Sequence, residues 1–487
     1  MLGLPKSAWC AVLVGAVLRG GLLFWESLSV DEIFDLDTAR KGWLEIATEG
    51  DGFPPLFAWL LKSWLLVFPD ATAARALPLM FSVLTIPLVA RLATRWGGIA
   101  AGVWAAWLLA CSPLHIHYAR EVRSYALLSL AVAGSWLWLD LVYARRDRLS
   151  WGVFAVWVVV GCWTHYFFAA ALLCGIFATA WIHDEDRRSQ VVITAGAWVL
   201  LLVASSPLLL LLSGDLHRQT TWPSRPPFAL PAFAYTVFSW FSGFSIGPSA
   251  RELHSLSSRN AIFMAAPWGS VLLLILGALA FGIRSWSRPR WWWAMVATTI
   301  GGLLAMGIGC NVLGVGYNVR YVSWLVIPLV ISLAGGIVAG SPRQLSAAAT
   351  VALFLFFALA LANRTCLPKY QTEDARGLAA YLKSHRQQPV ILISGYMSLP
   401  VGHYLDGHWP LTYLDFDLAP QQRDPALADL LRHEIGDQPF WYVESRTFHE
   451  DAAGTLRARL DTYAELTLES RFAGIELYAG RPRTDVD

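Results

Sequence analysis

The chain contains a series of apolar runs long enough to cross a membrane, and this feature limits its fold more than any other. A bilayer core about 30 Å thick needs roughly 20 apolar residues in a helix, because lipid offers the backbone no other hydrogen-bonding partner. Of the 487 residues, 56% are apolar and 15% are charged, whereas soluble domains carry about 25% charged residues. The sequence therefore predicts a polytopic α-helical membrane protein and excludes a soluble enzyme, a disordered chain and a disulfide-stapled secreted domain.

We expect about eleven transmembrane helices. The first run resembles the core of a signal peptide, but Arg19 interrupts it and many runs follow, so we expect it to be retained. The fifth and sixth runs are short, and one bent hairpin is the alternative for that pair. The expected spans are 9–25, 73–93, 98–113, 124–142, 150–163, 166–182, 191–212, 261–283, 291–312, 321–340 and 345–363.

The apolar run 54–68 is expected to form an interfacial helix instead of a span. It has 15 residues, and Lys62 stands at its middle. With this choice, the short loops on one side hold 11 Lys and Arg in 34 residues, whereas the loops on the other side hold 9 in 112. Because cytoplasmic loops are enriched in basic residues, we expect a cytoplasmic N-terminus and outward-facing long loops.

We expect two domains. Residues 1–363 form a transmembrane domain, with outer-loop and interfacial helices in 26–72. The tail 364–487 forms a small extracytoplasmic α/β domain. Its pattern changes abruptly from apolar runs to amphipathic segments, in which helices alternate with strands. We find no phosphate-binding loop, metal cluster or nucleophile elbow in it. The expected helices are 373–384 and 425–435, and the expected strands are 389–394, 440–444, 465–471 and 474–479.

Two groups of charged residues on the outer side are candidates for chemistry. Asp31 and Glu32 follow the first span among apolar residues, where a carboxylate is costly and often functional; a solvated acidic loop is the alternative. Arg120, Glu121 and Arg123 lie between the third and fourth spans. Outer loops contain few arginines, so two arginines in this loop favour an anionic partner. The alternative is an interfacial anchor with an internal Arg–Glu pair.

Two smaller motifs lie at outer ends of spans. His165 follows the fifth span, and a lone histidine there is more often a core residue than a catalyst. Arg320 and Tyr321 begin the tenth span. This arginine can extend to lipid headgroups, but an arginine at a helix end also binds phosphate well.

Together these motifs resemble the C-type (GT-C fold) glycosyltransferases, and more closely the bacterial relatives of the protein O-mannosyltransferases and of the lipid A aminoarabinose transferase. The outer α/β tail fits as well. The matching residues are Asp31-Glu32, Pro54-Pro55-Leu56, Arg120-Glu121-Val122-Arg123-Ser124-Tyr125, Thr164-His165-Tyr166, and Arg320-Tyr321 followed by Pro328.

The resemblance implies transfer of a sugar from a polyprenyl-phosphate carrier to a lipid, glycan or protein acceptor. The reaction would take place at the outer face of the inner (plasma) membrane, in the cell envelope, by inverting attack. The implied catalytic residues are Asp31 as base, with Glu32 and Glu121. The implied substrate-binding residues are Arg120, Arg123, Tyr125, His165, Tyr166, Arg320 and Tyr321.

Two points depart from the family pattern or stay open. The family often has His or Lys before the Pro that opens the interfacial helix, whereas this chain has Phe53. Metal-dependent relatives are known, but a monophosphate carrier held by cationic side chains requires no divalent cation, so the metal requirement is left unknown. Nothing in the charge pattern indicates a nucleic-acid partner.

Three other functions compete with this interpretation. A transporter or flippase of lipid-linked sugars would need ionisable residues at mid-membrane depth, and the spans hold almost no acids. A non-catalytic scaffold would tolerate loss of Asp31 or Glu121. A ligase or polymerase that uses diphosphate carriers is the alternative within the enzyme class. We further expect Asp31 and Glu121 to face one cavity, and the tail to cap it without taking part in catalysis.

Overall fold

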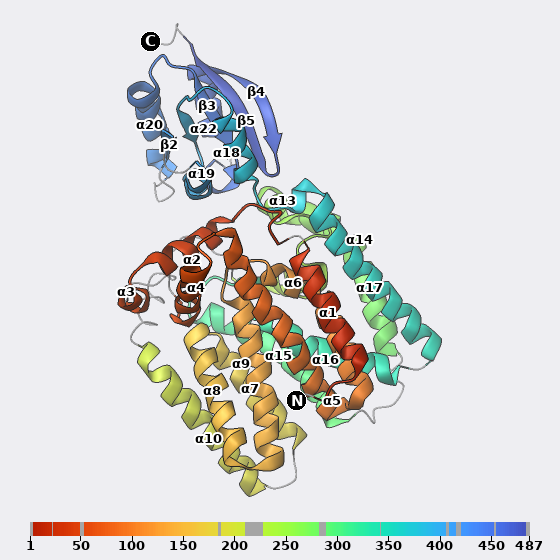
Figure 1. Ribbon diagram of the computed structural model, residues 1–487. Coiled ribbons are helices and arrows are strands. Elements are labelled where there is room, and N and C mark those ends of the chain that lie inside the picture. The colour runs from red at the N-terminus through yellow and green to blue at the C-terminus, as the bar shows by residue number, and fades with distance from the viewer. Residues whose placement is uncertain are drawn as a thin grey trace. The chain divides into compact units, whose positions relative to one another are not determined.

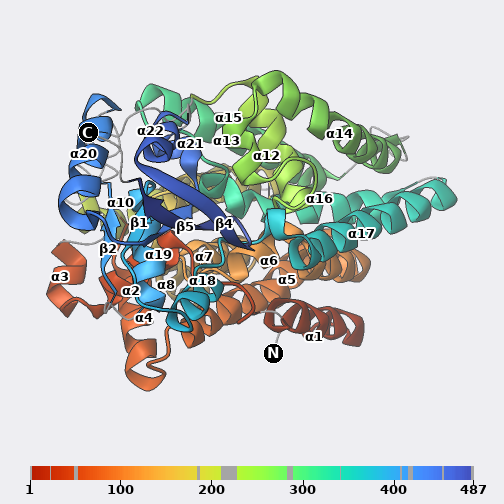
Figure 2. The ribbon, with the colours of Figure 1, turned by 90° about the horizontal axis from the view of Figure 1, so that it is seen from above.

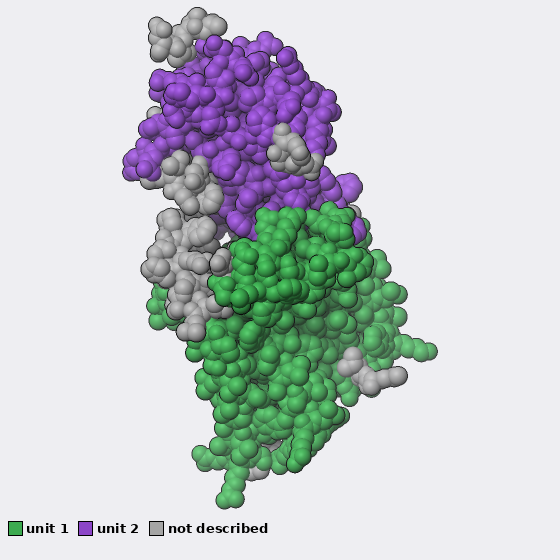
Figure 3. Space-filling view, turned by 60° about the vertical axis from the view of Figure 1, so that its left-hand side comes forward, with its two compact units in different colours: residues 1–23, 35–243, 268–361 green, residues 24–34, 244–267, 362–487 purple. Residues whose placement is uncertain are grey.

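A computed structural model divides into two compact units (Figures 1 and 3). Unit 1 comprises Met1–Leu23, Asp35–Gly243 and Trp268–Leu361, and unit 2 comprises Phe24–Phe34, Phe244–Pro267 and Ala362–Asp487. Unit 2 therefore contains the expected C-terminal domain together with two segments from earlier in the chain. The structure describes residues 3–21, 23–48, 53–183, 187–209, 227–281, 289–340, 342–405, 409–414, 420–451 and 454–483.

Apolar helices dominate the first 366 residues, which confirms a multi-span membrane protein. Within the described ranges, seven helices are long and apolar enough to cross a membrane, and three more are apolar but shorter. The ends of the expected spans 191–212 and 261–283 lie outside the described residues. The helices are α1 (Lys6–Gly20), α2 (Val30–Arg40), α3 (Trp43–Thr48), α4 (Leu56–Val67), η1 (Thr72–Arg75), α5 (Ala76–Cys111), α6 (Pro113–Ala119), α7 (Tyr125–Arg145), α8 (Arg148–Thr164), α9 (Phe168–Ile182), α10 (Arg187–Ser205), η2 (Ser206–Leu208), α12 (Leu230–Ser242), α13 (Ala250–Ser255), α14 (Ser258–Phe281), α15 (Arg290–Val312), η3 (Val319–Leu325), α16 (Val326–Ala339) and α17 (Arg343–Cys366).

The expected spans 73–93 and 98–113 are two arms of one helical element, α5, which reverses direction at Gly98. This glycine has φ +80°, a conformation that side chains with a Cβ rarely adopt. Four residues later, Gly102 lies against the first arm, since a Cβ there would stand 2.7 Å from the carbonyl oxygen of Ala90. The two arms therefore pack side by side as an antiparallel pair.

Arg19 lies fully buried near the C-terminal end of α1. Its guanidinium donates to the carbonyl oxygens of Leu109 and Ala110, at 3.0 and 2.9 Å, in the last turn of α5. It also contacts Nδ1 of His115 at 2.8 Å. Because the last carbonyls of a helix have no partner within it and carry partial negative charge, Arg19 caps α5, and this explains a charge inside the first span.

Lys62 has a similar role in α4, the helix that was expected in 54–68. Its Nζ donates to the carbonyl oxygens of Lys41 at 2.7 Å and Ala39 at 3.4 Å, at the C-terminal end of α2. The charge at the middle of α4 thus stabilises a neighbouring helix end. The interfacial position of α4 stays a prediction.

Unit 2 contains a mixed five-stranded sheet of order β2-β1-β3-β5-β4, which confirms the expected α/β character of the tail. Strand β1 pairs in parallel with β2 and β3, and the long β4–β5 hairpin is antiparallel (Figures 1 and 2). The elements are η4 (Pro368–Tyr370), α18 (Ala375–Lys383), β1 (Val390–Leu392), η5 (Gly395–Met397), α19 (Ser398–Tyr404), β2 (Leu411–Tyr413), α20 (Pro420–Leu430), η6 (Leu431–Ile435), β3 (Phe440–Glu444), α21 (Thr447–Glu450), α22 (Thr455–Tyr463), β4 (Ala464–Phe472) and β5 (Ile475–Pro482).

Alternating side chains of the strands divide the core of unit 2 into two layers. Val390 and Leu392 face one hydrophobic cluster, and Ile391 faces the other, as the two-residue period of a strand requires. Helix α18 packs in the first layer through Leu378, and α22 packs in the second through Leu456. Both faces of the central strands are therefore covered.

Candidate active site

Arg123 lies at the centre of a buried polar cluster in unit 1. It stands between α6 and α7, and its Nη1 donates to Oδ2 of Asp35 at 3.0 Å. The guanidinium also lies 5.2 Å from the ring centre of Phe53. A buried cation is tolerated when it is paired and hydrogen-bonded, so Asp35 and the aromatic face account for its position here.

His165 lies beside Arg123 and is 1% exposed. The rings of Phe53 and Phe167 contact it at 5.1 and 4.9 Å between centroids. Its Nδ1 accepts a hydrogen bond from the backbone N–H of Phe167 at 3.2 Å, which places the ring proton on Nε2. Within the described part of the chain, that Nε2–H has no hydrogen-bond partner. It is a buried donor for which the described residues supply no acceptor.

The charge state of His165 follows from its surroundings. Burial lowers the pKa of His165 to about 3, and the positive charges of Arg123 and Arg320 act in the same direction. The imidazole is therefore neutral at physiological pH and serves as a hydrogen-bond donor without adding charge.

Arg320 lies in η3, and its positive charge acts on His165. The side chain of Asn318 accepts a hydrogen bond from the backbone N–H of Arg320 at 3.1 Å and fixes the start of this turn. The neighbouring Tyr321 is buried, and its ring packs on Phe167 at 4.5 Å. We name Arg123, His165 and Arg320 the donor cluster. Two guanidinium groups and a neutral N–H within aromatic walls form an arrangement suited to an oxyanion, because charged donors act more strongly where water is excluded.

A small cavity of about 20 Å³ adjoins the donor cluster, and this is enough space for one water molecule. Pro54 and Pro55, the residues that open α4, help to line it with Phe53 and Arg123. The Pro-Pro motif and the departure at Phe53 both belong to this site. Phe53 places an aromatic face against both Arg123 and His165.

The other residues expected between the third and fourth spans have local partners in the structure. Glu121 forms an ion pair with Nε2 of His117 at 3.1 Å. Arg120 donates to the carbonyl oxygens of Leu18 and Arg19, and therefore caps the C-terminus of α1. Tyr125 is buried, with its ring 5.7 Å from that of His165, and Tyr166 is half-buried.

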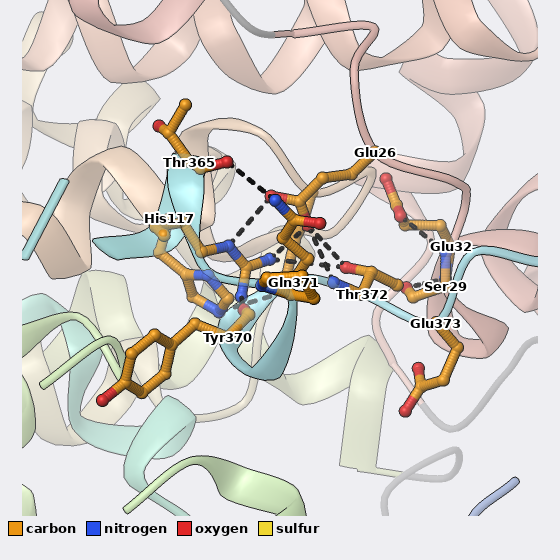
Figure 4. A network of polar contacts seen from close by, with 12 residues as sticks. Glu26, Ser29, Glu32, His117, Thr365, Tyr370, Gln371, Thr372 and Glu373 are labelled. Carbon is orange, nitrogen blue, oxygen red and sulfur yellow. Dashed lines mark hydrogen bonds and ion pairs between the residues drawn. The ribbon is translucent and has the colours of Figure 1, made fainter. Parts of the chain in front are cut away.

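Asp31 and Glu32 occupy the first turn of α2, in unit 2. Glu32 is buried, and its Oε2 accepts from the backbone N–H of Ser29 at 2.9 Å, while Oγ of Ser29 accepts from the N–H of Glu32 at 3.3 Å (Figure 4). This reciprocal pair is a capping box, which stabilises the start of a helix. Because Asp31 and Glu121 belong to different units, a shared cavity stays a prediction.

Sequence reasoning did not single out Asp35, the partner of Arg123. It lies four residues after Asp31 on α2, and residues with this spacing share a helix face. It is also buried, in contrast to the exposed Asp37. The four-residue spacing of Asp31 and Asp35 could have indicated that the two acids share a helix face. The same loop contains many other acids, so this spacing did not stand out.

Comparison with solved structures assigns the fold. ArnT from Cupriavidus metallidurans in the apo state matches with a TM-score of 0.55 and 15% identity, over 96% of this chain and 97% of that chain. ArnT bound to undecaprenyl phosphate gives a TM-score of 0.55 at 14% identity, over 98% of both chains. The Archaeoglobus fulgidus oligosaccharyltransferase in complex with Zn and sulfate gives 0.54 at 11% identity, over 97% of this chain and 73% of that one.

The chain has the GT-C fold. No family model and no curated protein sequence matches it, so the GT-C assignment depends on the structure. Among the residues described for this GT-C chain, no three His, Cys, Asp or Glu side chains are grouped as a metal ion requires. The donor cluster consists of groups that hold an anion and not a cation.

The capping box of this GT-C chain predicts how Glu32 responds to substitution. Glu32→Gln should keep the thermal midpoint and any transfer activity within a few-fold of wild type, because Gln also completes a capping box. Glu32→Ala should lose about 1 kcal/mol of stability. Thermal unfolding in detergent and an activity assay test both variants. A loss of activity above about 100-fold in Glu32→Gln at an unchanged midpoint would instead make Glu32 a catalytic residue.

The buried His165 predicts a pH-dependent stability. Its pKa is about 3 in the fold and about 6.5 in an unfolded chain, so the unfolded state binds more protons between these values. Stability should therefore fall as the pH drops below about 6.5. His165→Phe should remove part of this fall, by several degrees in the thermal midpoint near pH 4.5. The exposed His433 provides the control His433→Gln, and equal slopes in all three proteins would contradict the expectation.

Proposed function

We propose that this protein is an integral-membrane glycosyltransferase that moves a sugar from a polyprenyl-phosphate carrier to an acceptor hydroxyl at the outer face of the plasma (inner) membrane. The observation that carries the proposal is the donor cluster, in which the Nε2–H of His165 lies buried beside Arg123 and Arg320 with no partner in the described residues. The GT-C fold supports it, since one matching ArnT structure is bound to undecaprenyl phosphate.

The reaction that fits this site is an inverting displacement. The acceptor oxygen attacks the anomeric carbon as the bond from that carbon to the phosphate oxygen breaks, and the electron pair leaves with the phosphate. The proton of the acceptor hydroxyl passes to the Asp31 carboxylate as general base. The carrier phosphate changes from a diester with one negative charge to a monoester with two.

The donor cluster would stabilise the negative charge that builds up on the phosphate. Arg123, Arg320 and the Nε2–H of His165 would bind the phosphate more strongly as its charge grows, and an interaction that is stronger in the transition state accelerates the reaction. We assign Tyr125, Tyr166 and Tyr321 to the walls of the sugar-phosphate site. Glu121 is the second candidate base. Arg120 and Glu32 would act indirectly, through the ends of α1 and α2 that they stabilise.

The test of the proposal is donor consumption by the purified full chain. The protein in detergent is incubated with a panel of polyprenyl-phosphate sugars and with lipid, glycan or protein acceptors. We expect one donor to disappear while free polyprenyl phosphate accumulates in equal amount. Folded protein that consumes no donor, yet moves lipid-linked sugars across proteoliposome membranes, would overturn the proposal in favour of a flippase.

A further inference from the structure

The C-terminal domain supplies hydrogen-bond partners for the chain that precedes α2. Residues 24–28 lie between α1 and α2 and form no helix or strand of their own. A backbone outside regular structure must find partners elsewhere for its N–H and carbonyl groups. Here these partners come from residues of unit 2 that lie more than 300 positions later in the chain. We name residues 24–28 the anchored segment.

Glu26 lies at the middle of the anchored segment and forms an ion pair with Arg364. Its carboxylate accepts from Nε and Nη2 of Arg364, at 2.9 and 2.6 Å, and from the hydroxyl of Thr372 at 2.7 Å (Figure 4). Burial raises the pKa of Glu26, but Arg364 and Thr372 outweigh it and lower the pKa to about 2. The carboxylate is therefore ionised throughout the physiological pH range. Because a pair with two parallel hydrogen bonds is directional, it also sets the orientation of Glu26.

The residues on either side of Glu26 are bound in a similar way. Arg376 donates from Nη1 to the carbonyl oxygen of Phe24 at 3.1 Å and from Nη2 to that of Trp25 at 2.5 Å. Its backbone N–H donates to the hydroxyl of Ser27 at 3.1 Å, and that hydroxyl donates to Oδ1 of Asp374 at 2.9 Å. Each residue from Phe24 to Ser27 therefore has a hydrogen-bond partner in the C-terminal domain.

The anchoring continues into the first turn of α2, where Asp31 lies. The backbone N–H of Leu28 donates to the hydroxyl of Tyr404 at 2.8 Å, and the side chain of Leu28 is buried. The next residue is Ser29, which forms the capping box with Glu32. Asp31 stands between the two residues of that box, and a capping box fixes the start of a helix. The backbone position of Asp31 is therefore set by the anchored segment and the box that follows it.

Arg364 joins the anchored segment to the start of the C-terminal domain. It lies in the last turn of α17 and donates to the carbonyl oxygen of Tyr370 and to the hydroxyl of Thr372 at 3.3 Å. These contacts hold the guanidinium in place before it meets Glu26, so that little freedom is lost in forming the ion pair. The side chains of Arg364 and Glu26 are 21% and 16% exposed. Removal of either partner would leave a largely buried charge without its counter-ion.

We infer that Arg364 is a positioning residue for Asp31: through Glu26 it holds the anchored segment, and with it the first turn of α2, in the place that proton transfer requires. The inference deepens the proposed function, because it rests on that proposal for the role of Asp31 as base. A general base must lie within hydrogen-bond reach of the proton that it accepts, and a displacement of about 1 Å can cost about 100-fold in rate. The C-terminal domain thus contributes to catalysis by fixing where the base stands.

The order of the anchored segment can be measured without any sugar transfer. Amide hydrogen exchange of the full chain in detergent, followed by mass spectrometry of its peptides, reports local opening of residues 24–34. Arg364→Met should raise exchange in this peptide about 10- to 100-fold, because hydrogen bonds between charged groups are lost. Peptides that cover β3 should exchange as in wild type. Glu26→Gln removes the same ion pair from the other side and should change exchange in the same direction, even if Arg364→Met does not fold.

The catalytic consequence is read from donor consumption. Arg364→Met should lower kcat about 10- to 100-fold and leave KM for the donor within about threefold of wild type, because the donor cluster is unchanged. In an Asp31→Asn background no base remains to be positioned, so the same substitution should change the residual rate by less than about threefold. A general loss of structure would lower the rate equally in both backgrounds, and the difference between them therefore identifies positioning.

Arg471→Met is the matched control, since Arg471 forms an exposed ion pair with Glu476 in the same domain at 3.0 Å. This control should leave both the exchange of residues 24–34 and kcat unchanged. Exchange in Arg364→Met equal to that of wild type would overturn the inference, and so would an equal loss of rate with and without Asp31. The proposed function fails on a different result, which is a folded wild-type protein that consumes no donor.

Discussion

Asp31→Asn should reduce sugar transfer by about 100- to 10,000-fold while the protein inserts and folds normally. An amide cannot take the proton of the acceptor hydroxyl, and general-base catalysis typically contributes a factor of this size. The initial rate of donor consumption measures the loss. Asp37→Asn provides a matched control, since Asp37 lies on the same helix but is exposed and paired with Arg40. If Asp31→Asn keeps its activity and Glu121→Gln loses it, the base is Glu121.

Arg320→Lys should lower the turnover rate by roughly 30- to 1,000-fold, because the loss of one charged, desolvated contact costs about 2–4 kcal/mol in the transition state. A guanidinium can donate to two phosphate oxygens at once, and an ammonium group cannot reproduce that geometry. The exposed Arg40 provides the control Arg40→Lys. If Arg320→Lys and Arg320→Ala both turn over donor within a few-fold of wild type, Arg123 becomes the better candidate for the phosphate contact.

The helices of the fold could be predicted wherever the sequence contains a long apolar run. Apolar runs of about 20 residues have few alternatives to a transmembrane helix, and the short apolar run 440–444 predicted the buried strand β3. The three residues of β2 are too few to show a period. Gly98 could be identified as a glycine but not as the point where α5 reverses, because the contact that reveals the reversal joins Gly102 to Ala90.

The sequence singled out candidate residues by their type and by their place at the ends of apolar runs, but it did not reveal the partners of each residue. His165 and Arg320 were singled out because a histidine and an arginine end apolar spans, and the structure places both at the donor cluster. Arg120 and Glu32 have the same residue types, yet their local partners are the ends of helices. A charge that caps a helix and a charge that binds substrate look alike in a sequence, because only the three-dimensional neighbours differ.

The attachment of Glu26 to Arg364 has a consequence for biosynthesis. Asp31 leaves the ribosome early, but the arginine that anchors its segment is synthesised 338 residues after Glu26. At 5–20 residues per second, this interval lasts roughly 20 to 70 s. During that time the segment that contains Glu26 emerges without its binding partners. The segment that contains Glu26 and Asp31 is therefore anchored only when synthesis is nearly complete.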